Sequence, residues 1–268
     1  GNIQLDNFNL GKLLNRTDVG VVNLDLEVDG KGFIQKYLNT KLEGKVNSIF
    51  YNNYNYTNVV VDGTMVKSIF SGEITVNDPN LQMDFDGNLN LNNKENKYDF
   101  HANVEYANLE KLKLYTADSI SVFRGDVTMK LEGNTIDNLH GDVFINHTSY
   151  ENNKDTYFFF FFVVKSSFDE NRVRTMTINS PDIIEGKVVG KFQFNQLQKL
   201  IENSLGSLYA NYSPNKVNKG QFLKFDFNVY SKLIEIFYPE ISLGENTIMR
   251  GSINSNSDEF KFNFKSPS

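Results

Sequence analysis

Alternation of apolar and polar residues constrains the fold of this chain more than any other feature of its sequence. Apolar side chains occupy every second position in several segments, for example at Val22, Leu24, Leu26 and Val28. The pattern returns in the segments 81–85, 89–91, 127–131, 143–145, 192–194 and 260–264. Because successive side chains of a strand point to opposite faces, this period of two predicts a sheet with one apolar and one polar face.

Glycines fall in phase with the apolar positions of these strands. An apolar-x-Gly-x-apolar unit occurs at Phe70–Ile74, Phe85–Leu89, Phe123–Val127, Leu139–Val143 and Met249–Ile253. Glycine weakens a strand, so its repeated use needs a reason. We infer that the missing side chains let the sheet bend sharply toward its apolar face, which predicts an elongated trough with an apolar lining. A closed β-sandwich or barrel with glycines at its corners is an alternative that this pattern favours about equally.

A longer internal repeat favours the trough. The segment Ile74–Pro79 matches Met176–Pro181, and Phe262–Pro267 resembles the start of another copy. The three prolines stand at 79, 181 and 267, which are 102 and then 86 positions apart. We expect three repeats, at roughly 1–100, 101–190 and 191–268, in one continuous all-β array.

Short helices are expected after several strands. Four segments combine an Asn with apolar residues at near-helical spacing: Phe8–Leu14, Ala107–Leu112, Phe194–Ile201 and Phe227–Ile234. Asn is a favourable helix N-cap, so each segment is expected to end a strand in a helical turn. The third is the strongest candidate and predicts a helix from Asn195 to about Ala210, with one apolar face formed by Leu197, Leu200, Ile201, Leu205 and Leu208. The fourth is expected to stop near Phe237.

Composition argues against several classes of function. The net charge is −6 and no basic cluster stands out, so a nucleic-acid partner is not expected. Cysteine is absent, which excludes disulfides and thiolate metal sites. The longest apolar run, Tyr157–Val164, is far shorter than the ~20 residues of a membrane-spanning helix. Since the chain begins Gly1-Asn2-Ile3, without an initiator Met or signal peptide, we interpret it as an interior piece of a longer protein.

These motifs resemble those of a known family. The Asn-Leu-x-Lys-Leu turn at 108–112, the glycine-containing strands and the Ser/Asp-Pro motifs are similar, over the whole chain, to the AsmA-like repeats of the TamB family. The abundance of Asn and Lys would suit an AT-rich genome such as those of the Bacteroidetes. An N-terminal membrane helix and the aromatic C-terminal segment of TamB are missing here, which fits an interior fragment.

The resemblance implies a fold, a location and a function. Members of this group are periplasmic proteins that are anchored at the inner membrane and reach toward the outer membrane. Their fold is a β-taco, a strongly bent antiparallel or mixed sheet with short helices and a hydrophobic groove. They are implicated in moving phospholipid between the membranes. The implied partners are phospholipid and an outer-membrane barrel of the TamA/BamA type, and the implied membrane anchor lies outside this fragment.

Side chains suited to catalysis are scattered. His101, His140 and His147 lack the spacing of a metal-ligand set, so we expect surface positions and no metal site. The carboxylates expected to be solvated on the polar face include Asp84, Asp86, Asp126 and Asp142. The sequence has neither a Gly-x-Ser-x-Gly elbow nor a phosphate-binding Gly-Lys-Ser/Thr loop. We therefore expect no enzyme and no cofactor.

The favoured function depends on all the residues that line the predicted groove together, and on no single one of them. Its residues are Val22, Leu24, Leu26, Val28, Ile74, Val76, Leu81, Met83, Phe85, Leu89, Leu91, Val127, Met129, Leu131, Val143, Ile145, Phe192 and Phe194. An acyl chain buried at ~0.8 kcal/mol per CH₂ gains roughly ten kcal/mol or more, and a lining without a polar trap lets it move. This predicts a bridge-like lipid conduit.

Two other functions compete with the conduit. The first is a structural or assembly module that engages a barrel partner by β-augmentation at an exposed edge and aids outer-membrane protein biogenesis. The second, a carbohydrate-active β-helix enzyme, is weaker because it predicts a carboxylate cluster that the sequence lacks.

The five consecutive phenylalanines Phe158–Phe162 break the alternation around them. They indicate a strand buried on both faces, an aggregation-prone patch, or a placeholder in the sequence. The third interpretation is slightly favoured, and no functional argument rests on these residues.

Overall fold

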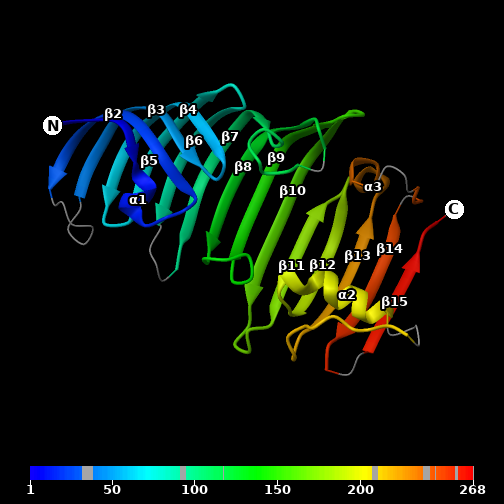
Figure 1. The fold of residues 1–268 in the computed structure, drawn as a ribbon. Coiled ribbons are helices and arrows are strands. Elements are labelled where there is room, and N and C mark those ends of the chain that lie inside the picture. The colour runs from blue at the N-terminus through cyan, green and yellow to red at the C-terminus, as the bar shows by residue number, and fades with distance from the viewer. Residues whose placement is uncertain are drawn as a thin grey trace. The chain divides into compact units, whose positions relative to one another are not determined.

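Fifteen antiparallel strands among the described residues form one open sheet in the computed structural model (Figure 1). The structure describes residues 1–31, 39–90, 95–116, 118–206, 211–237, 242–244, 246–256 and 259–267. The strands are β1 (Asn2–Asn9), β2 (Val19–Lys31), β3 (Asn39–Tyr51), β4 (Tyr54–Val66), β5 (Ile69–Asp78), β6 (Leu81–Asn90), β7 (Lys97–Asn108), β8 (Ser121–Glu132), β9 (His140–Asn152), β10 (Thr156–Phe168), β11 (Arg174–Ser180), β12 (Ile184–Lys191), β13 (Phe222–Val229), β14 (Thr247–Asn254) and β15 (Glu259–Lys265). The helices are α1 (Leu10–Leu14), the 3₁₀-helix η2 (Phe194–Gln196), α2 (Leu197–Gly206) and α3 (Ser231–Phe237).

The order of the strands in the sheet is their order in the sequence. Each strand pairs with its sequence neighbours, so β1 and β15 are the two end strands. The prediction of an all-β sheet with short helices is therefore confirmed, and the alternative of a closed sandwich or barrel is wrong. Tight turns explain part of this order. In the β3–β4 hairpin, Asn52 and Asn53 take φ of 47° and 66°, the left-handed pair that a two-residue type I′ turn needs.

The chain divides into two compact units. Unit 1 comprises residues 1–130 and 144–158, and unit 2 comprises residues 131–143 and 159–268. The division falls within β8, β9 and β10, because these strands contribute residues to both units. The unit boundaries coincide with neither predicted repeat boundary, at 100 or at 190, so the three repeats stay a prediction.

The four Asn-containing segments differ in structure. In α1 the side chain of Asn9 caps the helix and accepts a hydrogen bond from the Lys12 backbone N–H at 2.9 Å, as predicted. The second segment, Ala107–Leu112, ends β7 in a helical turn, as predicted, because the Leu112 N–H donates to the Asn108 carbonyl and the Asn108 side chain accepts from the Lys111 N–H. Among the described residues, no helix has the length and apolar character of a transmembrane span.

The third and fourth segments are helical without an Asn cap. Gln193 precedes η2, and its side chain makes no capping hydrogen bond. The α2 helix follows directly and is described as far as Gly206, so the predicted end near Ala210 and the position of Leu208 lie outside the described residues. The α3 helix is described as far as Phe237, and the residues that follow the predicted stop lie outside the described residues.

The phenylalanine run lies in β10. Phe158 and Phe160 are 69% and 83% exposed, so the interpretation of a strand buried on both faces is wrong. Alternation explains the exposure, since these two positions share one face of the strand while Phe159 and Phe161 are half-buried.

Candidate functional site

In unit 1 the apolar positions of seven strands lie on one face of the sheet. One continuous row of paired residues crosses all seven strands, in the order Leu5, Leu24, Val46, Val59, Val76, Met83 and Val104. The register places ten of the predicted lining residues on this face: Val22, Leu24, Leu26, Val28, Ile74, Val76, Leu81, Met83, Phe85 and Leu89. Val22, Val76 and Phe85 are buried and the others are half-buried. The predicted Leu91 lies outside the described residues.

Glycines form a row of their own on the same face. Gly63 pairs with Gly72, and Gly72 pairs with Gly87. Gly72 has a φ of +154°, and a Cβ atom built on it would clash with the carbonyl oxygen of Asp62 and with Cα of Gly63. The residue is therefore glycine for its backbone conformation and for the close approach of β4. The predicted phase of these glycines is confirmed, and the sharp bend inferred from them stays a prediction.

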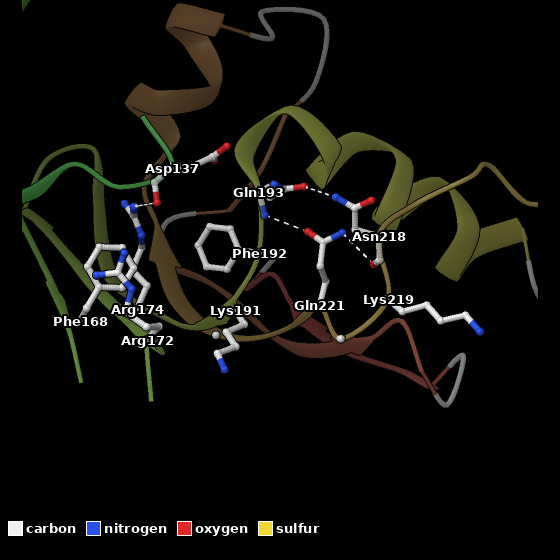
Figure 2. A pocket seen from close by; sticks show the side chains of 12 residues that line it. Asp137, Phe168, Arg172, Arg174, Lys191, Phe192, Gln193, Asn218, Lys219 and Gln221 are labelled. Carbon is white, nitrogen blue, oxygen red and sulfur yellow. Dashed lines mark hydrogen bonds between the residues drawn. The ribbon is translucent and has the colours of Figure 1, made fainter. Parts of the chain in front are cut away.

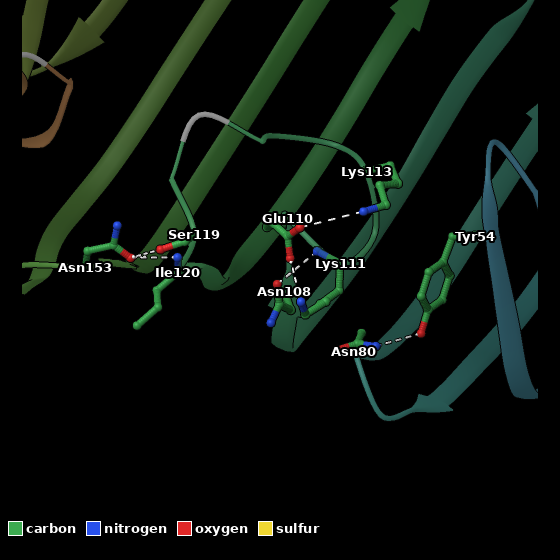
Figure 3. A network of polar contacts seen from close by, with 9 residues as sticks. All are labelled: Tyr54, Asn80, Asn108, Glu110, Lys111, Lys113, Ser119, Ile120 and Asn153. Carbon is green, nitrogen blue, oxygen red and sulfur yellow. Dashed lines mark hydrogen bonds and ion pairs between the residues drawn. The ribbon is translucent and has the colours of Figure 1, made fainter.

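The turn after β7 covers part of this face (Figure 3). The side chain of Asn108 accepts a hydrogen bond from the Lys111 N–H at 3.1 Å, and the Asn108 carbonyl accepts one from the Leu112 N–H at 2.9 Å. The turn thereby buries Leu112 against Val104 and Ala107. On its outer side, Glu110 forms ion pairs with both neighbouring lysines of the turn. The turn thus combines polar contacts among its own residues with an apolar side chain, Leu112, that packs on the sheet.

A buried carboxylate fixes the end of β5. Asp78 accepts hydrogen bonds from the Tyr54 hydroxyl at 2.5 Å, from the Thr57 N–H and hydroxyl at 2.9 and 2.7 Å, and from the Asn80 N–H at 2.8 Å. Burial acts to raise the pKa of Asp78, but these hydrogen bonds hold it below its ordinary value. The carboxylate therefore stays ionised and serves the structure of the turn.

Unit 2 contains an apolar space that is partly open to solvent, which we call the apolar cavity. Its volume is about 440 Å³. Every residue that lines it is apolar: Met176, Val188, Phe192, Phe194, Leu197, Ile201, Leu223, Phe225, Phe227, Met249, Ile253, Phe260 and Phe262. The α2 helix lies against this face, since its buried Leu200 packs on Leu223 and Ile253. Two of the predicted lining residues, Phe192 and Phe194, are brought together here.

Aromatic rings continue the cavity wall to the end of the sheet. Phe260, Phe262 and Phe264 stack along β15, with ring centroids 6.0 and 6.3 Å apart. The ring centroid of Phe225, in β13, lies 6.3 Å from that of Phe262. Phe262 and Phe264 are 47% and 46% exposed, so the apolar wall reaches solvent.

Most of the cavity lining was missed by the predicted set. The alternation of Leu223, Phe225 and Phe227 is the same signal that identified Phe192 and Phe194, and it could have found them. The contribution of α2 could not be found in this way, because a strand period does not show which helix packs on a face.

The remaining predicted residues lie in two strands away from the cavity lining. Val127, Met129 and Leu131 belong to β8, and Val143 and Ile145 belong to β9. All are half-buried. They are not among the residues that line the apolar cavity.

The titratable residues considered in the sequence make local contacts. Asp126 accepts hydrogen bonds from Asn103 at 2.7 Å and from His147 at 2.9 Å, which hold its pKa below the ordinary value. His101 lies 3.2 Å from the Thr128 hydroxyl, and His140 lies 3.2 Å from the Asn138 carbonyl. Further contacts join Asp84 to Thr75 at 2.7 Å and Asp142 to Lys165 at 3.6 Å.

Comparison with known proteins does not identify the chain: no family model, no curated protein and no solved structure matches it.

Proposed function

We propose that this chain binds the acyl chains of phospholipid on the apolar face of its sheet and conveys them, rather than catalysing a reaction. The apolar cavity carries this proposal. Its volume of about 440 Å³ falls in the range of about 300–1,000 Å³ that is typical of ligand sites, and all of its lining is apolar. Burial of an acyl chain there contributes ~0.8 kcal/mol per CH₂.

The chemistry of the cavity lining favours movement of an acyl chain over its binding in one fixed position. Specific small-molecule sites combine an apolar wall with a few polar groups that fix the orientation of the ligand. The apolar cavity lacks such groups, since its described lining is made of Phe, Leu, Ile, Val and Met alone. An acyl chain would therefore be solvated without being fixed at one place.

The resemblance to the AsmA-like repeats of the TamB family supports the same function and extends it. We accordingly place the chain in the periplasm, on a path for phospholipid between the inner and outer membranes. A barrel of the TamA/BamA type would be the partner at the outer membrane.

The first test is native mass spectrometry with lipid extraction on the chain purified from a bacterial envelope. The native chain should carry phospholipid, and the double variant Ile201→Asp with Phe262→Asp should lose it. These two residues line the cavity and are 46% and 47% exposed, so both carboxylates can be accommodated without unfolding. The matched control is Leu13→Asp with Val60→Asp, at residues 68% and 48% exposed in unit 1.

Loss of lipid in the cavity variant alone supports the proposal. A folded native chain that carries no lipid, or equal lipid in all three proteins, contradicts it. Circular dichroism establishes that each variant keeps its sheet.

An assembly module is the second candidate. It is favoured by the open sheet, because an open sheet, unlike a closed barrel, can be extended by β-augmentation with a strand of another chain. A lipid-free chain that captures a barrel partner through β1 or β15 would favour this function over the conduit.

A further inference from the structure

A second space in unit 2, which we call the cationic pocket, shares the lining residue Phe192 with the apolar cavity. Figure 2 shows the side chains that line the cationic pocket. Its volume is about 360 Å³. Four cationic side chains line it, namely Arg172, Arg174, Lys191 and Lys219, against the single carboxylate of Asp137. Within the described part of the chain, no ion pair joins any of the four to a carboxylate. The pocket therefore holds an excess of positive charge.

Arg174 is the fixed member of this group. It is only 4% exposed, and its guanidinium donates to the carbonyl oxygens of Ile136 and Asp137 at 3.1 and 2.7 Å. It also lies over the rings of Phe168 and Phe194, 4.6 and 5.2 Å from their centroids. Burial lowers the pKa of Arg174 and Asp137 acts to raise it, but a guanidinium stays charged at any ordinary pH.

These neutral partners orient the Arg174 charge without neutralising it. A buried charge is costly unless it is paired, so an uncompensated guanidinium at a pocket wall suits an anionic ligand. Arg172 lies over the same Phe168 ring, 5.3 Å from its centroid, and is exposed. The two arginines thus both lie near one aromatic ring at the pocket (Figure 2).

Amide side chains close the opposite wall of the pocket. Gln221 accepts a hydrogen bond from the Gln193 N–H at 2.8 Å and donates to the Gln196 side chain at 2.8 Å. Asn218 donates to the Gln193 side chain at 2.7 Å. This network ties η2 and the residue before it to the segment before β13, so the wall is held in place.

The cationic pocket and the apolar cavity share a residue. Phe192 lines both spaces, and Phe194 lines the apolar cavity while its ring faces Arg174. An anionic group at the arginines would therefore lie next to an apolar space large enough for an acyl chain. That combination matches a molecule with a charged head and a hydrocarbon tail.

We propose that the cationic pocket binds the anionic head group, a carboxylate or a phosphate, of an amphiphile whose acyl chain occupies the apolar cavity. This inference rests on the proposed lipid binding and names the charge of the lipid. Arg174 supplies a fixed positive charge, and the exposed Arg172 and Lys191 supply contacts that can adapt to the head group. Charge-assisted hydrogen bonds of this kind are the strong ones.

The test compares oleate with methyl oleate, which has the same chain but no charge. Equilibrium dialysis of the radiolabelled compounds against the 268-residue chain should show oleate binding about tenfold more tightly. The double variant Arg172→Gln with Lys191→Gln should reduce this preference, although Arg174 keeps its charge, and leave methyl oleate binding unchanged. The control Lys187→Gln with Lys224→Gln removes the same charge from the polar face of β12 and β13 and should keep the preference.

The outcomes separate this inference from the proposed function. Equal binding of oleate and methyl oleate by the native chain, or an equal loss in both variants, overturns the head-group site but leaves lipid binding intact. Binding of neither compound overturns both proposals. Inorganic phosphate is the third probe: if it binds alone as tightly as oleate, the pocket serves free anions and the amphiphile proposal fails.

Discussion

Asp78 is the carboxylate that the described part of the chain buries most completely, and it belongs to the repeated Ser/Asp-Pro motif. Its hydrogen bonds join the end of β5 to the start of β4. At the last copy of the motif, the Ser266 hydroxyl accepts a hydrogen bond from the Gly244 N–H at 2.9 Å. At these two copies the polar residue before the proline accepts a hydrogen bond from a backbone N–H. At the middle copy the Ser180 hydroxyl is buried without a hydrogen-bond partner among the described residues, so this contact is not common to all three copies.

Replacement of Asp78 by Asn should lower the free energy of unfolding by about 1–3 kcal/mol at pH 7, because buried donors lose their acceptor. The folded-state pKa of Asp78 lies below its ordinary value, so its stabilisation is fully present above that value and is lost as the pH falls through the folded pKa. Urea denaturation at pH 7 and near pH 3 should show the difference between native chain and variant shrinking in acid. Asp84→Asn, at an exposed site, should cost less than about 0.5 kcal/mol. A difference that is independent of pH would contradict this account.

At the scale of elements, the two units use different structures to cover an apolar sheet face. In unit 1 a single turn after β7 places Leu112 against Val104 and Ala107. In unit 2 the α2 helix places Leu200 against Leu223 and Ile253. A turn fills a small area and leaves little space, whereas a helix spans several strands and leaves the apolar cavity beside it.

The position of α2 should depend on Leu200. The change Leu200→Ala should cost about 2–4 kcal/mol, because it removes a side chain that is only 2% exposed from a packed cluster. Hydrogen exchange should then quicken in residues 197–206 while the amides of β4 to β6 keep their protection. Lys199→Ala, at an exposed position of the same helix, should leave exchange unchanged. Equal effects of the two substitutions would show that Leu200 does not hold the helix.

At the scale of the whole molecule, the proposed conduit differs from a local lipid site in its sensitivity to distant charges. A conduit needs an apolar path along many strands, so one carboxylate anywhere on that path should block passage. A local site responds only to changes in its own lining. The positions predicted to lie on the path include Met83 in β6, Met129 in β8 and Ile145 in β9.

Each single change of Met83, Met129 or Ile145 to Asp should therefore reduce phospholipid transfer between donor and acceptor vesicles, by about tenfold or more. The expected cause is the high cost of placing a charge beside an acyl chain. Circular dichroism and urea denaturation would exclude loss of the sheet as the reason. If transfer survives all three substitutions and fails only in Ile201→Asp with Phe262→Asp, lipid binding is local and the conduit is contradicted.

Much of the fold could be predicted from the sequence because alternation reports directly on strand faces. The shared face of Leu24, Val76 and Met83 follows from a period of two, and the Asn9 cap follows from residue chemistry. The same reasoning holds at Ala107–Leu112, where Asn108 caps a helical turn that packs Leu112 on the sheet. It failed at Phe194–Ile201, where Gln193 rather than an Asn precedes the helix and makes no capping hydrogen bond.

By itself, the sequence determined that this protein is an all-β sheet whose strands have one apolar face with glycines in phase, because side-chain direction in a strand depends only on local geometry. Only the tertiary structure decided that the sheet is open, that α2 contributes to the wall of the apolar cavity, and that Arg172 and Arg174 line a second pocket that shares Phe192 with that cavity. These features depend on contacts between residues far apart in the chain. Arg174, for example, meets the carbonyls of Ile136 and Asp137 from more than 30 positions away. A local sequence pattern does not predict hydrogen bonds between residues so far apart in the chain.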